Sequence, residues 1–338
     1  MRRSLALAMT ATAIAAPCSA RQSRTHDLAL MPANVHWGYY DAHLRPVLRI
    51  ASGDAVRVET MVARGLERLR LAGVQEAEIP PALLAVEHAV TERGPGAHPM
   101  TGPIFVEGAE PGDALEVRIE EIGYLHPYGV GAFSPGGGTL PEDFPYAGLK
   151  LFRFTDGNRA TEFAPGIRLG LSPFFGSIGV APPVLSGRVS SGPPGYHAGN
   201  LDNRELGVGA TVWLPVHVAG GLLSIGDGHA LQGDGEVSGT AIETSLSGRI
   251  RVFLRKGMRL RWPRAETATH IITMGLDPDL DEAARLATRE MVDYLVAEKH
   301  LSREDAYILC SVAVDLRVTQ TVDGTKGIHA MLPKAIFR

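Results

Sequence analysis

The chain has 338 residues, of which 45% are hydrophobic and 21% are charged, as in soluble globular proteins with one large domain or two smaller ones. Its formal net charge is -4 at pH 7, and aromatic residues make up only 6% of the sequence. These values argue against nucleic acid or an anionic membrane surface as the main partner, because both attract clustered basic residues.

The first twenty residues have the pattern of a secretory signal peptide, in which Arg2 and Arg3 precede an apolar run and small residues surround a cleavage point near Ala20. The apolar run is too short to span a membrane. The paired arginines suggest the twin-arginine export route, with the general route as the alternative. We therefore expect a periplasmic or secreted mature protein from residue 21 onward. Its only cysteine is Cys310, so an intramolecular disulfide is excluded.

Alternating apolar and polar residues predict a body built mainly from β-strands. Residues 47–59 alternate on both sides of a Gly-Asp turn, and short helical or irregular pieces are expected at 65–93. Uneven spacing between similar runs favours a sandwich or barrel-like body over a solenoid with a fixed repeat. The further alternating runs cover residues 112–119, 209–216, 249–254 and 258–262.

Two stretches rich in glycine and proline are predicted to be irregular. The first, at 128–146, contains three consecutive glycines. No Lys-Ser/Thr pair and no helix pattern follows them, which argues against a phosphate-binding loop. The second, at 172–203, contains Phe174 and Phe175. We interpret these two side chains either as walls of a small-molecule pocket or as core aromatics.

The most informative stretch is 224–236, which places two aspartates, a glutamate, a histidine and a glutamine among four glycines. It lies between an apolar run and the alternating run 237–242, so the pattern predicts a strand, a polar loop and a second strand. The glycines allow short side chains to meet in one small volume. A solvated hairpin loop would also be polar and rich in glycine. Imidazole and carboxylate groups in so short a loop favour a divalent metal site instead.

Near residue 280 the pattern becomes helical. Apolar residues recur at helical spacing from 281 to 300, with acidic residues early and Lys299 late. Ser302 and the acidic residues after it predict the cap of a second helix that runs through 314. We expect a helical portion over about 280–315, on which Cys310 is either a small buried apolar residue or a catalytic thiol.

An ordered series of phrases resembles the acetamidase/formamidase family of amide hydrolases, from about residue 35 to the end. The loop at 226–236 is the most specific phrase. The resemblance implies hydrolysis of a small amide such as formamide or acetamide to a carboxylate and ammonia, here by an exported member. The phrases are HWGYYD at 36–41, TGPIFVEGA at 101–109, PFFG at 173–176, GVAP at 179–182, GNLD at 199–202, GDGHALQGDGE at 226–236, DLRVTQ at 315–320 and LPKAIF at 332–337.

Amide hydrolysis needs a nucleophile, stabilisation of a tetrahedral oxyanion and a proton for the departing amine. No Gly-x-Ser-x-Gly elbow and no serine-lysine signature is visible, so water activated by a divalent ion is the remaining nucleophile. We predict zinc, with calcium as the alternative. The predicted metal ligands are His36, Asp202, Asp227 and His229.

Glu236 is predicted to be the general base and proton shuttle. Asp234 is predicted to hold the metal ligands or Glu236 in position without contacting the metal itself. Asp41 and Gln232 are predicted to contact the substrate amide, and Phe174 and Phe175 to wall the pocket. Each assignment has a structural alternative. His36 could be a packing histidine, and Asp202 and Asp234 could be turn residues.

The sequence thus predicts one mainly β domain over residues 21–338, α+β overall because of its C-terminal helices, that hydrolyses a small linear amide with a metal. The partner is the small-molecule amide, without nucleic acid or a membrane span, and a homo-oligomer is left open. The rival from another class is a secreted binding module that holds a metal or small ligand without turnover. A hydrolase of another C–N bond, in a lactam or carbamate, is the third hypothesis.

Overall fold

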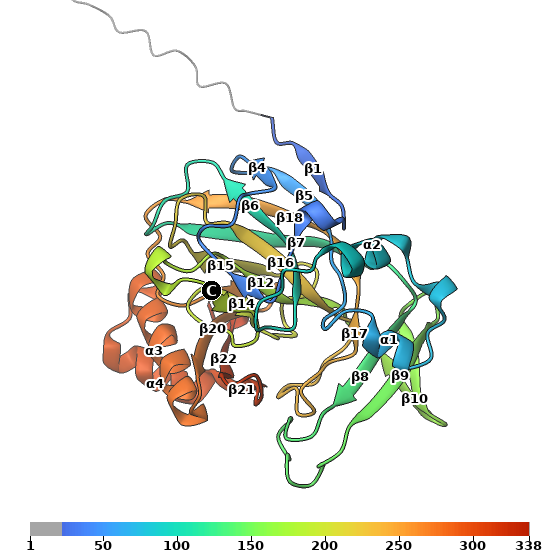
Figure 1. Ribbon diagram of the computed structural model, residues 1–338. Coiled ribbons are helices and arrows are strands. Elements are labelled where there is room, and N and C mark those ends of the chain that lie inside the picture. Colours follow the sequence, from blue (N-terminus) through green and yellow to red (C-terminus); the bar gives the residue numbers. More distant parts are fainter. Residues whose placement is uncertain (1–21, 338) are drawn as a thin grey trace, which may run out of the picture.

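The computed structural model describes residues 22–337, and the predicted signal peptide at 1–20 lies outside them. The described chain consists mainly of β-strands, with its two longest helices near the C-terminus, which confirms the predicted fold class (Figure 1). Within this part of the chain, no helix combines the length and apolar character that crossing a bilayer requires.

The first sheet contains nine strands of the described chain in the order β1-β5-β18-β7-β15-β19-β20-β22-β21. Its longest antiparallel pairing joins β7 to β18, with the buried Val117 opposite the buried Val252. The bounds are β1 Thr25–Leu28, β5 Ala55–Glu59, β18 Leu246–Arg255, β7 Ala114–Tyr124, β15 Thr211–Pro215, β19 Arg264–Glu266, β20 His270–Asp277, β22 Lys326–Pro333 and β21 Asp315–Gln320.

The second sheet contains eleven strands of the described chain, and β16 in its middle pairs with β6, β12 and β17. A small separate pair joins β3 Tyr39–Tyr40 to β13 Val189–Ser190. The bounds are β11 Ile167–Gly170, β10 Ala160–Ala164, β9 Gly148–Thr155, β8 Tyr128–Phe133, β17 Glu243–Thr244, β16 Leu223–His229, β12 Phe174–Gly179, β14 Ala198–Asn200, β6 Pro99–Val106, β2 Val35–Trp37 and β4 Leu48–Ile50.

The main core lies between these two sheets. Val56 and Val117 from the first sheet and Phe175 and Ile225 from the second belong to one cluster of buried side chains. Along β5 the buried residues alternate with the exposed Arg57, as the sequence pattern predicts. In the described residues neither strand order closes on itself, so the body is a pair of packed sheets and not a barrel.

Helices cover the ends of this body. The short α1 Glu67–Leu71 packs beside β8 and β9, and α2 Pro81–Ala89 packs beside the 3-10 turn Pro32–Asn34. Near the other end of the chain, α3 Leu280–Lys299 and α4 Arg303–Ala313 pack beside β20 and β22 (Figure 1). Asp279 caps α3 by accepting from the backbone N–H groups of residues 281 and 282, and Ser302 caps α4 through Asp305. Cys310 is buried among the apolar side chains of α3 and α4, as its apolar interpretation requires.

Four local predictions are wrong. The stretch 128–146, predicted to be irregular, begins with the strand β8. Residues 258–262, predicted to be a strand, are irregular. Of their alternating apolar residues, Trp262 packs against the core. The region 172–203, predicted to be irregular, contains the fully buried strand β12. Its glycines and serine have low strand propensity, so the sequence pattern did not indicate a strand. The run 237–242 is a loop, and the strand that returns beside β16 is the two-residue β17.

Candidate active site

The candidate site lies at the end of β16, in the middle of the second sheet. Asp227 and His229 belong to this strand, and a glycine precedes each of them. Asp227 has a φ of 55°, while Asp202 and Glu236, on neighbouring loops, have φ of 45° and 43°. Few non-glycine residues adopt this left-handed region, and those that do tend to gather at functional sites. Asp156 and Asp323 share this conformation, so the positive φ marks a functional site only together with the position of these residues around the end of β16.

The acidic side chains gather around one nitrogen of His229. Its Nε2 lies 3.3 Å from Asp227 Oδ2, 3.4 Å from Glu243 Oε2 and 3.9 Å from Asp202 Oδ1. Glu236 lies beside them, because one of its oxygens is within 4.8 Å of ligand atoms of Asp202 and His229. All five side chains are buried. Burying so many carboxylates together is unfavourable unless positive charge compensates them.

The ring of His229 is held in a defined orientation. Its Nδ1 donates to Gln232 Oε1 at 2.8 Å, and Gln232 Nε2 donates in turn to the backbone oxygen of Asp202 at 2.7 Å. The edge of Phe174 packs against the imidazole, with ring centroids 5.0 Å apart. Because Nδ1 carries this hydrogen, Nε2 of the neutral ring is the free ligand atom, and it faces the carboxylates.

The absence of a side chain at Gly176 leaves the space in which these groups meet. Gly176 lies on β12, which pairs with β16. A Cβ at this position would lie 2.5 Å from Asp227 Oδ2, 2.6 Å from Asp202 Oδ1 and 2.8 Å from His229 Cε1. Contacts this short are sterically forbidden, so the cluster requires glycine here.

A polar cavity of about 210 Å³ opens onto the cluster. Besides the acidic residues and His229, its lining includes Arg64, Arg68, His98, Asn200 and Asp323. Asn200 Nδ2 donates to Asp202 Oδ2 at 2.7 Å and to Asp323 Oδ2 at 3.2 Å. The cavity therefore presents hydrogen-bonding groups of both charges to whatever enters it.

Burial dominates the proton affinity of three of the carboxyl groups. It raises the pKa of Asp202 and the pKa of Glu236 well above their usual values, and the charges of neighbouring carboxylates raise them further. Burial also raises the pKa of Asp323 to about 6. A carboxyl group with a raised pKa can both take up and release a proton near neutral pH.

Asp227 and His229 behave in the opposite way, because their charges stabilise each other. Burial disfavours the charged form of each, but His98 and His229 outweigh it and lower the pKa of Asp227. Glu243 and Asp227 likewise outweigh burial and raise the pKa of His229 well above its usual value. The field inside the cluster therefore attracts positive charge to Nε2.

The structure brings together four of the residues that the sequence singles out: Asp202, Asp227, His229 and Glu236. Gln232 lies behind them, where it holds His229 and the Asp202 backbone. Phe174 packs on His229, whereas Phe175 is part of the main core.

The other predicted site residues lie apart from this cluster. His36 Nε2 is hydrogen-bonded to Ser224 Oγ at 2.9 Å, and the ring packs against Tyr39 and Tyr40 without lining the polar cavity. Burial lowers the pKa of His36 to about 4.

Asp41 and Asp234 are both paired with other side chains. Asp41 is hydrogen-bonded to His43 and forms an ion pair with Arg188. Asp234 forms an ion pair with Arg317, 2.6 Å from Nη2 to Oδ2, which ties the loop before Glu236 to β21.

Sequence reasoning missed Glu243, His98 and Asp323. Glu243 is the direct cross-strand neighbour of His229, so a correct prediction of where the hairpin loop ends would have identified it. His98 Nδ1 donates to the backbone oxygen of Ser191 at 2.8 Å, and its Nε2 lies 3.8 Å from Asp227 Oδ2. No local motif marks His98 or Asp323, which reach the site only through the sheet topology.

The chain is similar to proteins of one family over nearly its whole described length. The family model for acetamidases and formamidases matches residues 40–185 and 188–338. A putative formamidase of Schizosaccharomyces pombe is 33% identical over 195 residues, which cover 42% of this chain and 47% of that protein. The chain thus spans about half the length of the curated relatives it matches.

Solved structures are similar over a larger share of the chain. A predicted acetamidase/formamidase of Thermoanaerobacter tengcongensis has a TM-score of 0.80 and 31% identity, over 93% of this chain and 97% of that one. An acetamidase of Yersinia enterocolitica has a TM-score of 0.80 and 32% identity, over 94% of each chain.

Proposed function

The chain belongs to the acetamidase/formamidase family, and from this premise we propose that it hydrolyses the C–N bond of a small linear amide to a carboxylate and ammonia. The observation that carries the proposal is the buried cluster around His229 Nε2, with Glu243 and Asp227 at 3.4 and 3.3 Å. Such a cluster suits reactions in which charge and protons must be handled away from bulk water.

We further propose that a divalent metal ion, zinc or calcium, is bound in this cluster. Oδ1 of Asp202 and Oε2 of Glu243 are buried without a hydrogen-bond partner among residues 22–337, and both face His229 Nε2. The space that Gly176 leaves open lies between Asp202 and Asp227. Oxygen ligands and one imidazole fit zinc, and the excess of carboxylates also suits calcium.

The residues that would hold the ion are Asp227, His229 and Glu243, with Asp202 beside them, its Oδ1 3.9 Å from His229 Nε2. These atoms lie close enough together to share one ion, since the ligand atoms of the first three are within 4.8 Å of one another. A bound divalent ion would polarise the amide carbonyl and make a neighbouring water more acidic.

Glu236 has the position that a general base requires. It is buried, it lines the polar cavity, and it lies beside Asp202 and His229. We propose that its carboxylate takes a proton from the attacking water and gives it to the nitrogen of the departing amine. Arg64 and Arg68 line the same cavity and contribute positive charge toward the carbonyl oxygen or the carboxylate product.

We also propose export of this protein to the periplasm or the exterior. The support is the signal pattern of residues 1–20, in which Arg2 and Arg3 precede the apolar run.

The test is ammonia release from formamide and acetamide by the purified protein, with metal content measured on the same sample. Glu236→Gln should lower turnover by about 10²–10⁴-fold and leave the metal content unchanged. A matched control is Glu266→Gln. Glu266 lies on β19, and its carboxylate forms an ion pair with Lys334. A binding module without catalysis would bind metal but release no ammonia, and that result would refute the proposed activity.

A further inference from the structure

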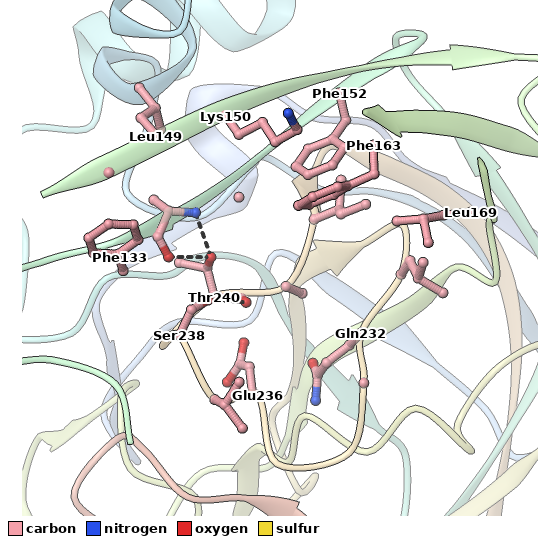
Figure 2. Close-up of a pocket in the computed structure, with 18 of the residues that line it drawn as sticks. Phe133, Leu149, Lys150, Phe152, Phe163, Leu169, Gln232, Glu236, Ser238 and Thr240 are labelled. Carbon is pink, nitrogen blue, oxygen red and sulfur yellow. Dashed lines mark hydrogen bonds between the residues drawn. The ribbon is translucent and has the colours of Figure 1, made fainter. Parts of the chain in front are cut away.

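A second cavity, of about 720 Å³, lies beside the polar one and has a different chemical character (Figure 2). Its walls come from β8, β9, β10 and β11 and from the loop between β16 and β17. Most of the lining side chains are apolar, including Phe133, Leu149, Phe152, Phe163 and Ile242.

The two cavities share part of their walls. Glu236 and Thr240 line both of them. Gln232, which accepts from His229 Nδ1, also lines the apolar cavity. In Figure 2, Glu236 and Gln232 lie on one side of the cavity, and Phe152 and Phe163 lie across from them. A molecule in the apolar cavity would therefore contact Glu236, which also lines the polar cavity.

At Thr240, the wall that the two cavities share has no free hydrogen-bonding group on the side chain. The Thr240 hydroxyl accepts from Ala132 N–H at 2.8 Å and donates to the Ala132 oxygen at 2.9 Å, as the dashed lines in Figure 2 mark. Both bonds tie the loop to β8 and satisfy the hydroxyl. What remains at this position is a methyl group, which suits an apolar ligand.

The apolar lining is also partly open to water. Leu149 is 37% exposed, Phe163 is 42% exposed and Val237 is 62% exposed. Phe152 and Phe163 have ring centroids 5.9 Å apart, and Lys150 Nζ lies 4.7 Å from the Phe163 ring centre. Contiguous exposed apolar surface of this kind is usual at ligand grooves.

Formamide and acetamide would use only the polar cavity of about 210 Å³ and leave the larger cavity empty. We infer that this protein acts on primary amides whose acyl group ends in a long alkyl or aryl group. The carboxamide enters the polar cavity beside Glu236, and the apolar end occupies the cavity between β8, β9 and the loop. This inference rests on the proposed amide hydrolysis and specifies its substrate class.

The expected preference follows from the hydrophobic contribution of the acyl group. Each methylene group that leaves water for an apolar pocket increases kcat/KM by up to about fourfold. With its three methylene groups and phenyl ring, 4-phenylbutanamide should have a kcat/KM at least about 30-fold above that of acetamide.

The experiment measures kcat/KM of the wild type and of variants with acetamide, hexanamide and 4-phenylbutanamide. Leu149→Asp places a charge in the apolar wall at a partly exposed position, and it should lower the ratio of 4-phenylbutanamide to acetamide by at least about tenfold. Phe163→Asp should act in the same direction and serves if Leu149→Asp fails to fold. The matched control is Leu185→Asp, at a fully exposed position outside this cavity, which should keep the wild-type ratio.

The outcomes separate the inference from the proposed function. Hydrolysis of acetamide without any preference for 4-phenylbutanamide would overturn the inference and leave amide hydrolysis standing. If no amide is hydrolysed, the proposed function fails together with the substrate preference, and calorimetric binding of 4-phenylbutanamide decides only whether the apolar cavity is a ligand site. Binding that Leu149→Asp weakens tenfold and Leu185→Asp does not would support the apolar subsite, and no binding would overturn it.

Discussion

Replacing Gly176 by alanine tests the geometry of the site with a single methyl group. The new Cβ would lie 2.5 Å from Asp227 Oδ2 and 2.6 Å from Asp202 Oδ1. Each oxygen must move by about 1 Å to reach ordinary van der Waals distance. Crowding of this kind in a packed interior costs about 1–3 kcal/mol of stability. A misplacement of about 1 Å in a catalytic site reduces the rate by about 10²-fold.

We therefore expect Gly176→Ala to fold with a melting temperature a few degrees lower but to lose about 10²-fold in kcat/KM on acetamide. The metal affinity should fall as well, by about 10–100-fold, because two proposed ligands are displaced. Gly170→Ala is the matched control, since Gly170 also lies in a strand and its Cβ would meet no atom within 4 Å. Wild-type activity and metal content in Gly176→Ala would refute the arrangement of Asp202, Asp227 and His229.

Three further predictions concern the same fold. Glu243→Gln should reduce metal content at least about tenfold in elemental analysis, and full occupancy would remove Glu243 from the ligand set. Arg317→Ala breaks the ion pairs with Asp234 and Glu205 and should lower kcat more than it raises KM, whereas an unchanged kcat would show that Glu236 needs no such support. Burial lowers the pKa of His126 to about 4, so between about pH 4 and pH 6.5 the unfolded state binds more protons at this residue than the folded state. The free energy of unfolding should therefore fall from about pH 6.5 toward pH 4, by up to roughly 1.4 kcal/mol per pH unit. Denaturant unfolding of His126→Phe should show a weaker fall, and a profile identical to that of the wild type would contradict this assignment.

Local patterns predicted the strands around 47–59 and the C-terminal helices well, because there the alternation and the caps act within a few residues. The capping residue Ser302 and the buried face of α3 were readable for this reason. The strand β12 was not, since its glycines have low strand propensity and its burial comes from neighbours distant in sequence.

The site shows the same division. Asp227, His229 and Glu236 lie in one glycine-rich stretch, so residue type alone singled them out. Glu243 was missed because the loop after His229 is longer than the pattern indicated, and His98 and Asp323 come from far along the chain. His36 was chosen for its residue type, but its contacts with Ser224 and Tyr39 are decided by the pairing of β2 with β6.

The most direct test of the central claim is a zinc titration of chelator-treated protein with ammonia release from acetamide as the readout. The cluster around His229 Nε2 predicts that activity is lost on chelation and returns in proportion to added zinc, with a plateau at about one equivalent per chain. Calcium, tested in parallel, should produce the same plateau if it is the native ion. Activity that chelation leaves intact, or that neither ion restores, would contradict a metal centre formed by Asp227, His229 and Glu243.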